Sequence, residues 1–164
     1  MIRWIVSLAV CALVSVPAVR AEDEKVPLDK LPKAVSDAVK KKYPKAKMVS
    51  AEKEKKDKKT VYEVKIKDGE QTIEVSLTPE GEIVEIEKVI AAKDLPTAVT
   101  TALGEKYPKA KIVKVEEITK GEKVTYEVLL VTADKKKLEV TFDGTGKVLE
   151  VEKKDEKKEE KKEK

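Results

Sequence analysis

Residues 31–47 read LPKAVSDAVKKKYPKAK, and residues 95–111 read LPTAVTTALGEKYPKAK. Eleven of the seventeen aligned positions are identical at an offset of 64 residues. The same offset aligns the YEV of residues 62–64 with the YEV of residues 126–128. An internal repeat of this length indicates that the chain contains two copies of one structural unit.

Each copy of the phrase predicts a helix. Its apolar residues recur at helical spacing: Leu31, Val35, Ala38, Val39 and Tyr43, and then Leu95, Val99, Ala102, Leu103 and Tyr107. A proline follows the leading leucine, at a first helical position where its missing N–H costs nothing. Pro44 and Pro108 disfavour helical dihedrals at the tyrosines before them and so end each helix. We expect both tyrosine rings to pack under the start of a sheet.

The remainder of each copy predicts four short strands. They lie at about 46–54, 60–67, 71–78 and 82–89, and at about 110–119, 123–132, 136–142 and 147–153. Apolar and charged residues alternate along them, which is typical of a sheet with one buried face and one wet face. We therefore predict an α+β fold. It is a tandem repeat of one helix followed by a four-stranded antiparallel sheet, with the helices packed on one sheet face and the other face exposed.

The termini differ in composition from the two copies. Residues 1–21 combine a charged start, an apolar run and a small-residue end, and predict a secretory signal peptide. An uncleaved membrane anchor is the alternative, but the apolar run is short for a span. Further boundaries are a charged lead at 22–30, the first unit at 31–88, a linker at 89–94, the second unit at 95–152 and a disordered Lys/Glu tail at 153–164.

The composition after residue 21 excludes several kinds of chemistry. Both arginines and the single cysteine and tryptophan lie within residues 1–21, and the chain has no histidine. The remaining charge is 34 lysines minus 32 acidic residues, or +2. Without His or Cys there is no thiol nucleophile, imidazole base or ordinary zinc or copper site. We expect no catalytic residues, no metal site and no cofactor.

The turn at residues 143–146 reads DGTG, which resembles part of a calcium-binding loop. Calcium takes six or more oxygen ligands, however, and only Asp143 is offered locally. Glycines in tight turns supply positive φ, which is reason enough for their presence. We interpret this segment as a hairpin turn.

The order of these motifs resembles a known family. The LP-x-AV helix, YPKAK, YEV and the FDGTGKVLE of residues 142–150 resemble the PepSY-like family, which is also called beta-lactamase-inhibitor-like. The first copy departs at its ending, where residues 77–81 read LTPEG. The resemblance implies an exported bacterial protein with tandem helix-plus-sheet repeats, as in proteinaceous beta-lactamase inhibitors. It also implies binding of an enzyme through a concave sheet, and it transfers no catalytic residue.

The two copies disagree at one pair of wet-face positions. Lys65 and Lys67 of the first copy correspond to Leu129 and Val131 of the second. A strand that is apolar on both faces is covered by something. Cover from the other copy, the tail or a second chain is one interpretation. An exposed apolar patch that binds a protein is the other, and it makes these four residues the candidate binding site.

Three functions remain open. The first is an exported, periplasmic or secreted, non-catalytic binding module for an unknown protein, which would also act as an inhibitor of an exported enzyme. The second is a binding protein for a small ligand or an anionic cell-envelope polymer, held by lysine ammonium groups. The third is a hydrolase using carboxylates such as Glu63 and Glu74, although alternation already explains them as solvated sheet-face charges. Nucleic acid is not an expected partner, because arginine and stacking aromatic residues are lacking. Nor do we expect an integral membrane protein after signal cleavage.

Overall fold

The computed structural model describes residues 24–56 and 59–154. The predicted signal peptide at 1–21 and all of the predicted tail beyond residue 154 lie outside this range. The elements in chain order are β1 (Glu24–Lys25), η1 (Leu28–Lys30), α1 (Lys33–Lys42), β2 (Lys47–Lys56), β3 (Lys59–Asp68), β4 (Gln71–Leu77), β5 (Ile83–Val89), η2 (Ala92–Asp94), α2 (Thr97–Lys106), β6 (Lys111–Lys120), β7 (Lys123–Val131), β8 (Lys137–Asp143) and β9 (Val148–Lys153).

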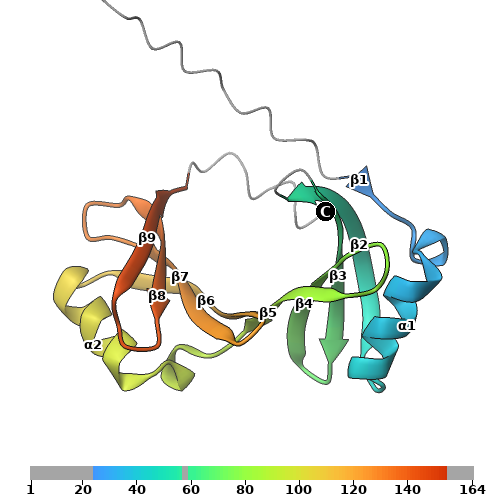
Figure 1. Cartoon of the computed structure of the whole chain (residues 1–164). Helices are drawn as coiled ribbons and strands as arrows, with labels where there is room; N and C mark the ends of the chain where they lie inside the picture. The colour runs from blue at the N-terminus through green and yellow to red at the C-terminus, as the bar shows by residue number, and fades with distance from the viewer. Residues whose placement is uncertain (1–23, 57–58, 155–164) are drawn as a thin grey trace, which may run out of the picture.

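The strands form one continuous antiparallel sheet in the order β1 to β9 (Figure 1). The predicted fold, a tandem repeat of one helix followed by a four-stranded antiparallel sheet, is therefore wrong. The two halves are joined by β5 and β6, which pair from Ile86 opposite Thr119 to Val89 opposite Glu116. The outer edge of β5 would otherwise leave a row of backbone N–H and C=O groups unpaired, and β6 supplies their partners.

The ninth strand was not predicted, because it lies in the charged lead. In β1, Glu24 pairs with Lys53 of β2. The 64-residue offset takes this pair to Lys88 and Glu117, which pair between β5 and β6. The lead thus occupies, beside β2, the place that the end of β5 occupies beside β6.

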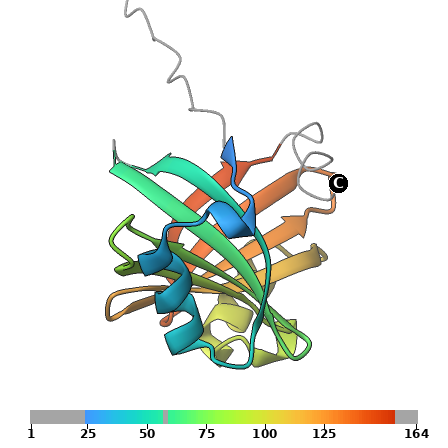
Figure 2. The ribbon, with the colours of Figure 1, turned by 90° about the vertical axis from the view of Figure 1, so that its right-hand side faces the viewer.

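Both helices lie against the convex face of the sheet (Figures 1 and 2). Each begins directly after its proline, Pro32 or Pro96, which takes the N-cap position rather than the first helical position. Each is followed by its tyrosine as C-cap, Tyr43 or Tyr107, in agreement with the helix ends expected from the next prolines. No helix within the described part of the chain is long and apolar enough to cross a membrane.

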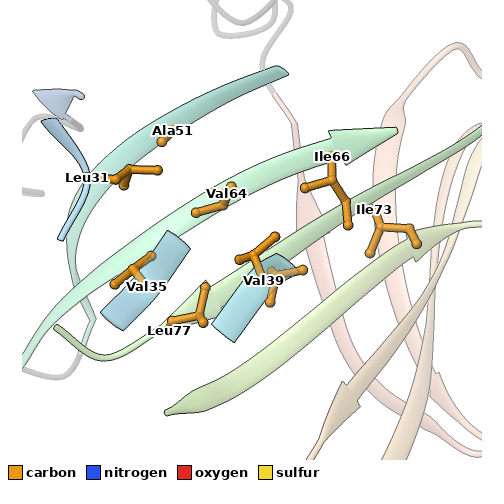
Figure 3. Packing of buried hydrophobic residues seen from close by; sticks show 9 residues of the cluster. Leu31, Val35, Val39, Ala51, Val64, Ile66, Ile73 and Leu77 are labelled. Atoms are coloured by element: carbon orange, nitrogen blue, oxygen red, sulfur yellow. The ribbon is translucent and has the colours of Figure 1, made fainter. Parts of the chain in front are cut away.

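Each helix covers its own buried cluster of aliphatic side chains. Under α1, Val35 and Val39 point toward Val64 and Leu77 of the sheet (Figure 3). The second cluster has the same plan under α2, with Phe142 at the position that corresponds to Leu77. Phe142 and Leu77 are completely buried. The half-buried tyrosines Tyr43 and Tyr107 pack against the two clusters, as expected.

Four irregularities in strand pairing accompany the curvature of the sheet. The register shifts between Met48 and Ser50 in β2, and at the corresponding place in β6, between Ile112 and Lys114. It shifts again where β4 pairs with β5 and where β8 pairs with β9. Bulges bend strands and increase their twist. The result is a sheet whose helix-free face is concave.

The turns before β5 and β9 touch the first turns of the helices. Gly146 has a φ of +83°, and a Cβ atom placed on it would lie 2.8 Å from the carbonyl carbon of Ala98 in α2. Gly81 makes the same approach to Ala34 in α1. These contacts fix the position of each helix on the sheet. They also explain why the turn before β5 and the turn before β9 both contain a glycine, since any side chain there would meet the helix backbone.

Substitution of Gly146 by alanine tests this contact. We expect Gly146→Ala to lower the free energy of unfolding by about 2–4 kcal/mol, because the methyl group adds a backbone clash to the strain of positive φ. Gly121→Ala has positive φ but open space around it, and should cost about 1 kcal/mol. Gly144→Ala has neither problem and serves as the control. Urea unfolding measures all three, and equal losses at Gly146 and Gly121 would contradict the proposed clash.

Candidate functional site

The concave face is the sheet face without helices (Figure 1). Alternation along the strands places many glutamates on it, and we call nine of those on β2 to β8 the glutamate cluster. They are Glu52, Glu54, Glu63, Glu74, Glu85, Glu87, Glu116, Glu127 and Glu139. Five lysines reach into this cluster with their ammonium groups: Lys56, Lys65, Lys114, Lys120 and Lys154.

In the first half of the sheet, two lysines neutralise the cluster. Lys65 in β3 lies opposite Glu74 in β4, and its Nζ is 2.7 Å from the Glu74 carboxylate. The Nζ of Lys56 lies 3.8 Å from both Glu54 and Glu63. Burial alone would lower the pKa of Lys56, but the surrounding glutamates, Glu85 foremost, outweigh burial and raise it. Lys56 is therefore held in the charged form.

The most buried members of the cluster, Glu85 and Glu116, are 8% and 7% exposed. Lys120 binds Glu85 at 3.0 Å across the β5–β6 junction, and Lys114 binds Glu116 at 2.7 Å. Burial opposes the ionisation of Glu85, but the hydrogen bonds from Glu87 and Lys120 lower its pKa overall. An ion pair thus compensates the desolvation of both carboxylates.

Glu87 differs from its neighbours, because no lysine within the described ranges forms an ion pair with it. It lies in the middle of the sheet, opposite Glu74 on β4 and Ile118 on β6. Burial raises the pKa of Glu87 to about 8, and hydrogen bonding to Glu85 and the charge of Glu116 add to the shift. At neutral pH, Glu87 therefore carries a proton that it donates to Glu85.

Glu127 is the second such group, again with no lysine ion pair from the residues that the structure describes. It lies opposite Glu116 on β6 and in contact with Glu139 on β8. Burial, followed by the charge of Glu139, raises the pKa of Glu127 to about 7. Lys154 binds Glu139 but only weakly offsets this effect on Glu127.

The four residues of the predicted binding site do not form one site. Lys65 and Lys67 are on β3, and Leu129 and Val131 are on β7, so that three strands separate the two pairs. Leu129 lies between Lys114 and Glu139 and is only 8% exposed. It is therefore not the exposed apolar side chain that the hypothesis required, and the binding role of all four residues stays a prediction.

Glu63 and Glu74, the two carboxylates considered as hydrolytic groups, each have a lysine partner. Glu74 is bound by Lys65, and Glu63 lies beside Lys56. The hollow that they line with Glu52 and Ser50 measures about 40 Å³, room for a water molecule or two. Such a hollow is too small for a substrate cleft.

The glutamates that the structure describes do not form a metal site. Within residues 24–56 and 59–154, no three acidic side chains converge as a set of metal ligands. In the turn first compared with a calcium loop, the Asp143 Oδ1 accepts hydrogen bonds from Thr145 N at 2.9 Å and Lys147 N at 3.1 Å. That side chain holds the hairpin closed, as the interpretation of a plain turn requires.

Sequence reasoning missed the importance of Glu87 and Glu127. Alternation alone places them on the wet face, but their raised pKa values depend on neighbours from other strands. Glu87 meets Glu116 only because β5 pairs with β6. The sequence did contain a signal for the face on which they lie. Glutamate recurs every eleven residues at 52, 63, 74 and 85, which places these residues on successive strands of one face.

The buried proton on Glu87 predicts a pH dependence of stability. Its pKa is higher in the folded chain than in the unfolded chain, so its stabilising contribution is complete below about pH 4.5 and is lost as pH rises through about 8. We expect the free energy of unfolding to fall by about 1 kcal/mol per pH unit on approaching pH 8. Glu87→Gln should flatten this slope, since the amide stays neutral. Urea unfolding between pH 5 and 9.5 measures it. The exposed Glu105→Gln is the control, and an unchanged slope in Glu87→Gln would contradict the assignment.

Comparison with solved structures finds the same fold in three Bacteroides proteins. One from Bacteroides uniformis, of the DUF2874 family, is 19% identical with a TM-score of 0.67, covering 74% of this chain and 88% of its own. One from Bacteroides eggerthii, described as "putative periplasmic", is 21% identical with a TM-score of 0.64 at the same coverage. A BLIP-like protein from Bacteroides fragilis is 22% identical with a TM-score of 0.59, covering 76% and 89%.

Comparison with curated proteins finds no match. The family model described as "Putative beta-lactamase-inhibitor-like, PepSY-like" matches residues 18–85 and again residues 60–150. These two matches span both copies of the opening phrase, and they confirm the resemblance inferred from the motifs. The chain belongs to the PepSY-like, beta-lactamase-inhibitor-like family.

Proposed function

We propose that this chain is an exported, non-catalytic module that binds another protein on its concave face. The observation that carries the proposal is the β5–β6 junction, which makes one curved surface out of both halves. Neither helix lies over this surface (Figures 1 and 2). A broad face with only a small hollow suits the surface of a protein better than it suits a small molecule.

The charges of the concave face support specific recognition of a protein. Lys65, Lys114 and Lys120 are held by glutamates at 2.7–3.0 Å, so the pattern of charge is arranged before a partner arrives. A pre-arranged charge pattern favours specificity and correct orientation of the partner. The same pairs disfavour the anionic-polymer function, because these ammonium groups already have carboxylate partners.

Export and lack of catalysis rest on further observations. Residues 1–21 have the composition of a signal peptide, and the similar protein from Bacteroides eggerthii is described as "putative periplasmic". Glu63 and Glu74, which line the small hollow of the concave face, both have lysine partners. The family's description as beta-lactamase-inhibitor-like suggests that binding serves to inhibit an exported enzyme.

Capture of the partner, followed by titration of the two purified proteins, tests the proposal. We expect Leu129→Lys, on the concave face, to weaken binding at least about tenfold, because it adds a charge at the contact. Thr101→Lys adds the same charge to the exposed surface of α2 and should leave binding unchanged. If both variants bind like the original chain, the concave face is not the binding surface.

The inhibitory role has a separate measurement. If the partner is an enzyme, one equivalent of this chain should reduce its turnover, and Leu129→Lys should restore it in proportion to the loss of binding. Tight binding on the concave face without loss of turnover would remove inhibition from the proposal and leave the binding function.

A further inference from the structure

β9, the last strand of the sheet, is the second copy of β5 (Figure 1). The two strands pair in the same register with their inner neighbours at an offset of 65 residues. Glu87 of β5 lies opposite Glu74, and Glu152 of β9 lies opposite Glu139. β5 therefore provides an internal comparison for β9.

The backbone groups on the outer edge of β5 are bonded to β6. Just beyond the strand, Ile90 N donates a hydrogen bond to Val115 O. Bonded residues alternate with non-bonded ones in an antiparallel pair, so Ile86 and Lys88 also direct their N–H and C=O groups toward β6. The side chain of Ile86 packs against the first buried cluster. This edge is thus closed by a strand.

The side chains of β6 complement those of β5. Glu117 lies opposite Lys88, and Lys120 binds Glu85 at 3.0 Å. The uncharged Ile118 faces the glutamate between these two pairs. Along β6 the order is therefore acidic, apolar, threonine and lysine, which is the EITK of residues 117–120.

The outer edge of β9 has no strand beside it among the residues that the structure describes. Lys154 N donates to Lys137 O on the β8 side. By the same alternation, Val151 and Lys153 direct their N–H and C=O groups away from β8. Val151 is 48% exposed, although its counterpart Ile86 is packed. An edge of this kind is a template for another strand.

We propose that an extended segment of another protein pairs with the outer edge of β9 as an added antiparallel strand. The charged residues of β9 match those of β5, since Glu150, Glu152 and Lys153 correspond to Glu85, Glu87 and Lys88. The segment that fits has an acidic residue opposite Lys153, an uncharged residue opposite Glu152 and a lysine opposite Glu150. This edge is separate from the concave face, so the inference does not depend on the proposed function.

Two other occupants fit this edge less well. In a second copy paired about a twofold axis with Val151 opposite itself, the glutamates at 150 and 152 would face each other. With Val151 opposite Lys153, the two glutamates at 152 would do so. Like charges directly opposite each other destabilise a strand pair. The tail at 155–164 consists of Lys, Glu and Asp alone and has no apolar side chain to cover Val151.

A peptide copy of β6 tests the proposal. The probe is the capped peptide of residues 114–121, KVEEITKG. Its control, KVEKITEG, exchanges one glutamate and one lysine and so keeps composition and charge. We expect the probe to bind at least about fivefold more tightly than the control, because it places opposite charges across the pair. NMR titration at millimolar peptide measures both affinities from the Val151 and Lys153 amides, whose hydrogen exchange should also slow. Equal affinities, or no change at these amides, would overturn the proposal.

Three variants locate the effect. Lys153→Glu should weaken binding of the probe at least about threefold, and should bind KVEKITKG more tightly than the original chain does. Val151→Pro removes an outward N–H, which an edge strand tolerates, and should abolish binding. Lys45→Glu makes the same charge change on an exposed residue of the first half and is the control. Amide NMR spectra confirm that each variant is folded. Unchanged binding in Lys153→Glu would contradict the assignment.

The remaining outcomes distinguish the occupants. If exchange of the Val151 and Lys153 amides in the chain alone slows as protein concentration rises, a second copy occupies the edge. If that exchange is slow and becomes fast when residues 155–164 are removed, the tail occupies it. Either result would overturn the proposal that another protein pairs with β9. Leu129→Lys should leave probe binding unchanged, so that this inference and the proposed function can fail separately.

Discussion

The backbone pairing between β5 and β6 is the constraint on which the rest of this structure depends. It runs from Ile86 and Thr119 to Val89 and Glu116, and it continues with a hydrogen bond from Ile90 N to Val115 O. Without it, each half would be a small sheet under one helix, and a unit of about 60 residues has only marginal stability. With it, both helices share one convex face and the opposite face becomes a single curved surface.

That surface concentrates charge in a place where charge is costly. Glu85 and Glu116 are more than nine-tenths buried, and a buried carboxylate needs a partner to remain ionised. Lys120 meets this need from β6 for a glutamate on β5, so the junction between the halves is electrostatic as well as backbone-bonded. At Glu87 and Glu127, with which none of the described lysines forms an ion pair, the carboxyl group has a raised pKa instead.

Several features could be predicted from the residues because they depend on near neighbours. Helix ends followed from Pro44 and Pro108, and strand positions followed from period-two alternation. The surroundings of Leu129 could not be predicted in the same way. Its apolar character was plain, but its burial depends on Lys114 and Glu139, which come from two other strands. Sequence patterns report on one strand at a time, while a sheet face is assembled from many.

The sequence by itself determined the elements. These are two helices, each with a proline before it and a proline after it, the strands that follow each helix, and the side of each strand that faces a core. These are local properties, set by proline geometry and by the spacing of apolar side chains. Only the tertiary structure decided that the strands form one sheet and that Glu87 meets Glu116 across it. The physical reason is that any free strand edge accepts a partner through its backbone groups, and those groups are the same for every residue except proline.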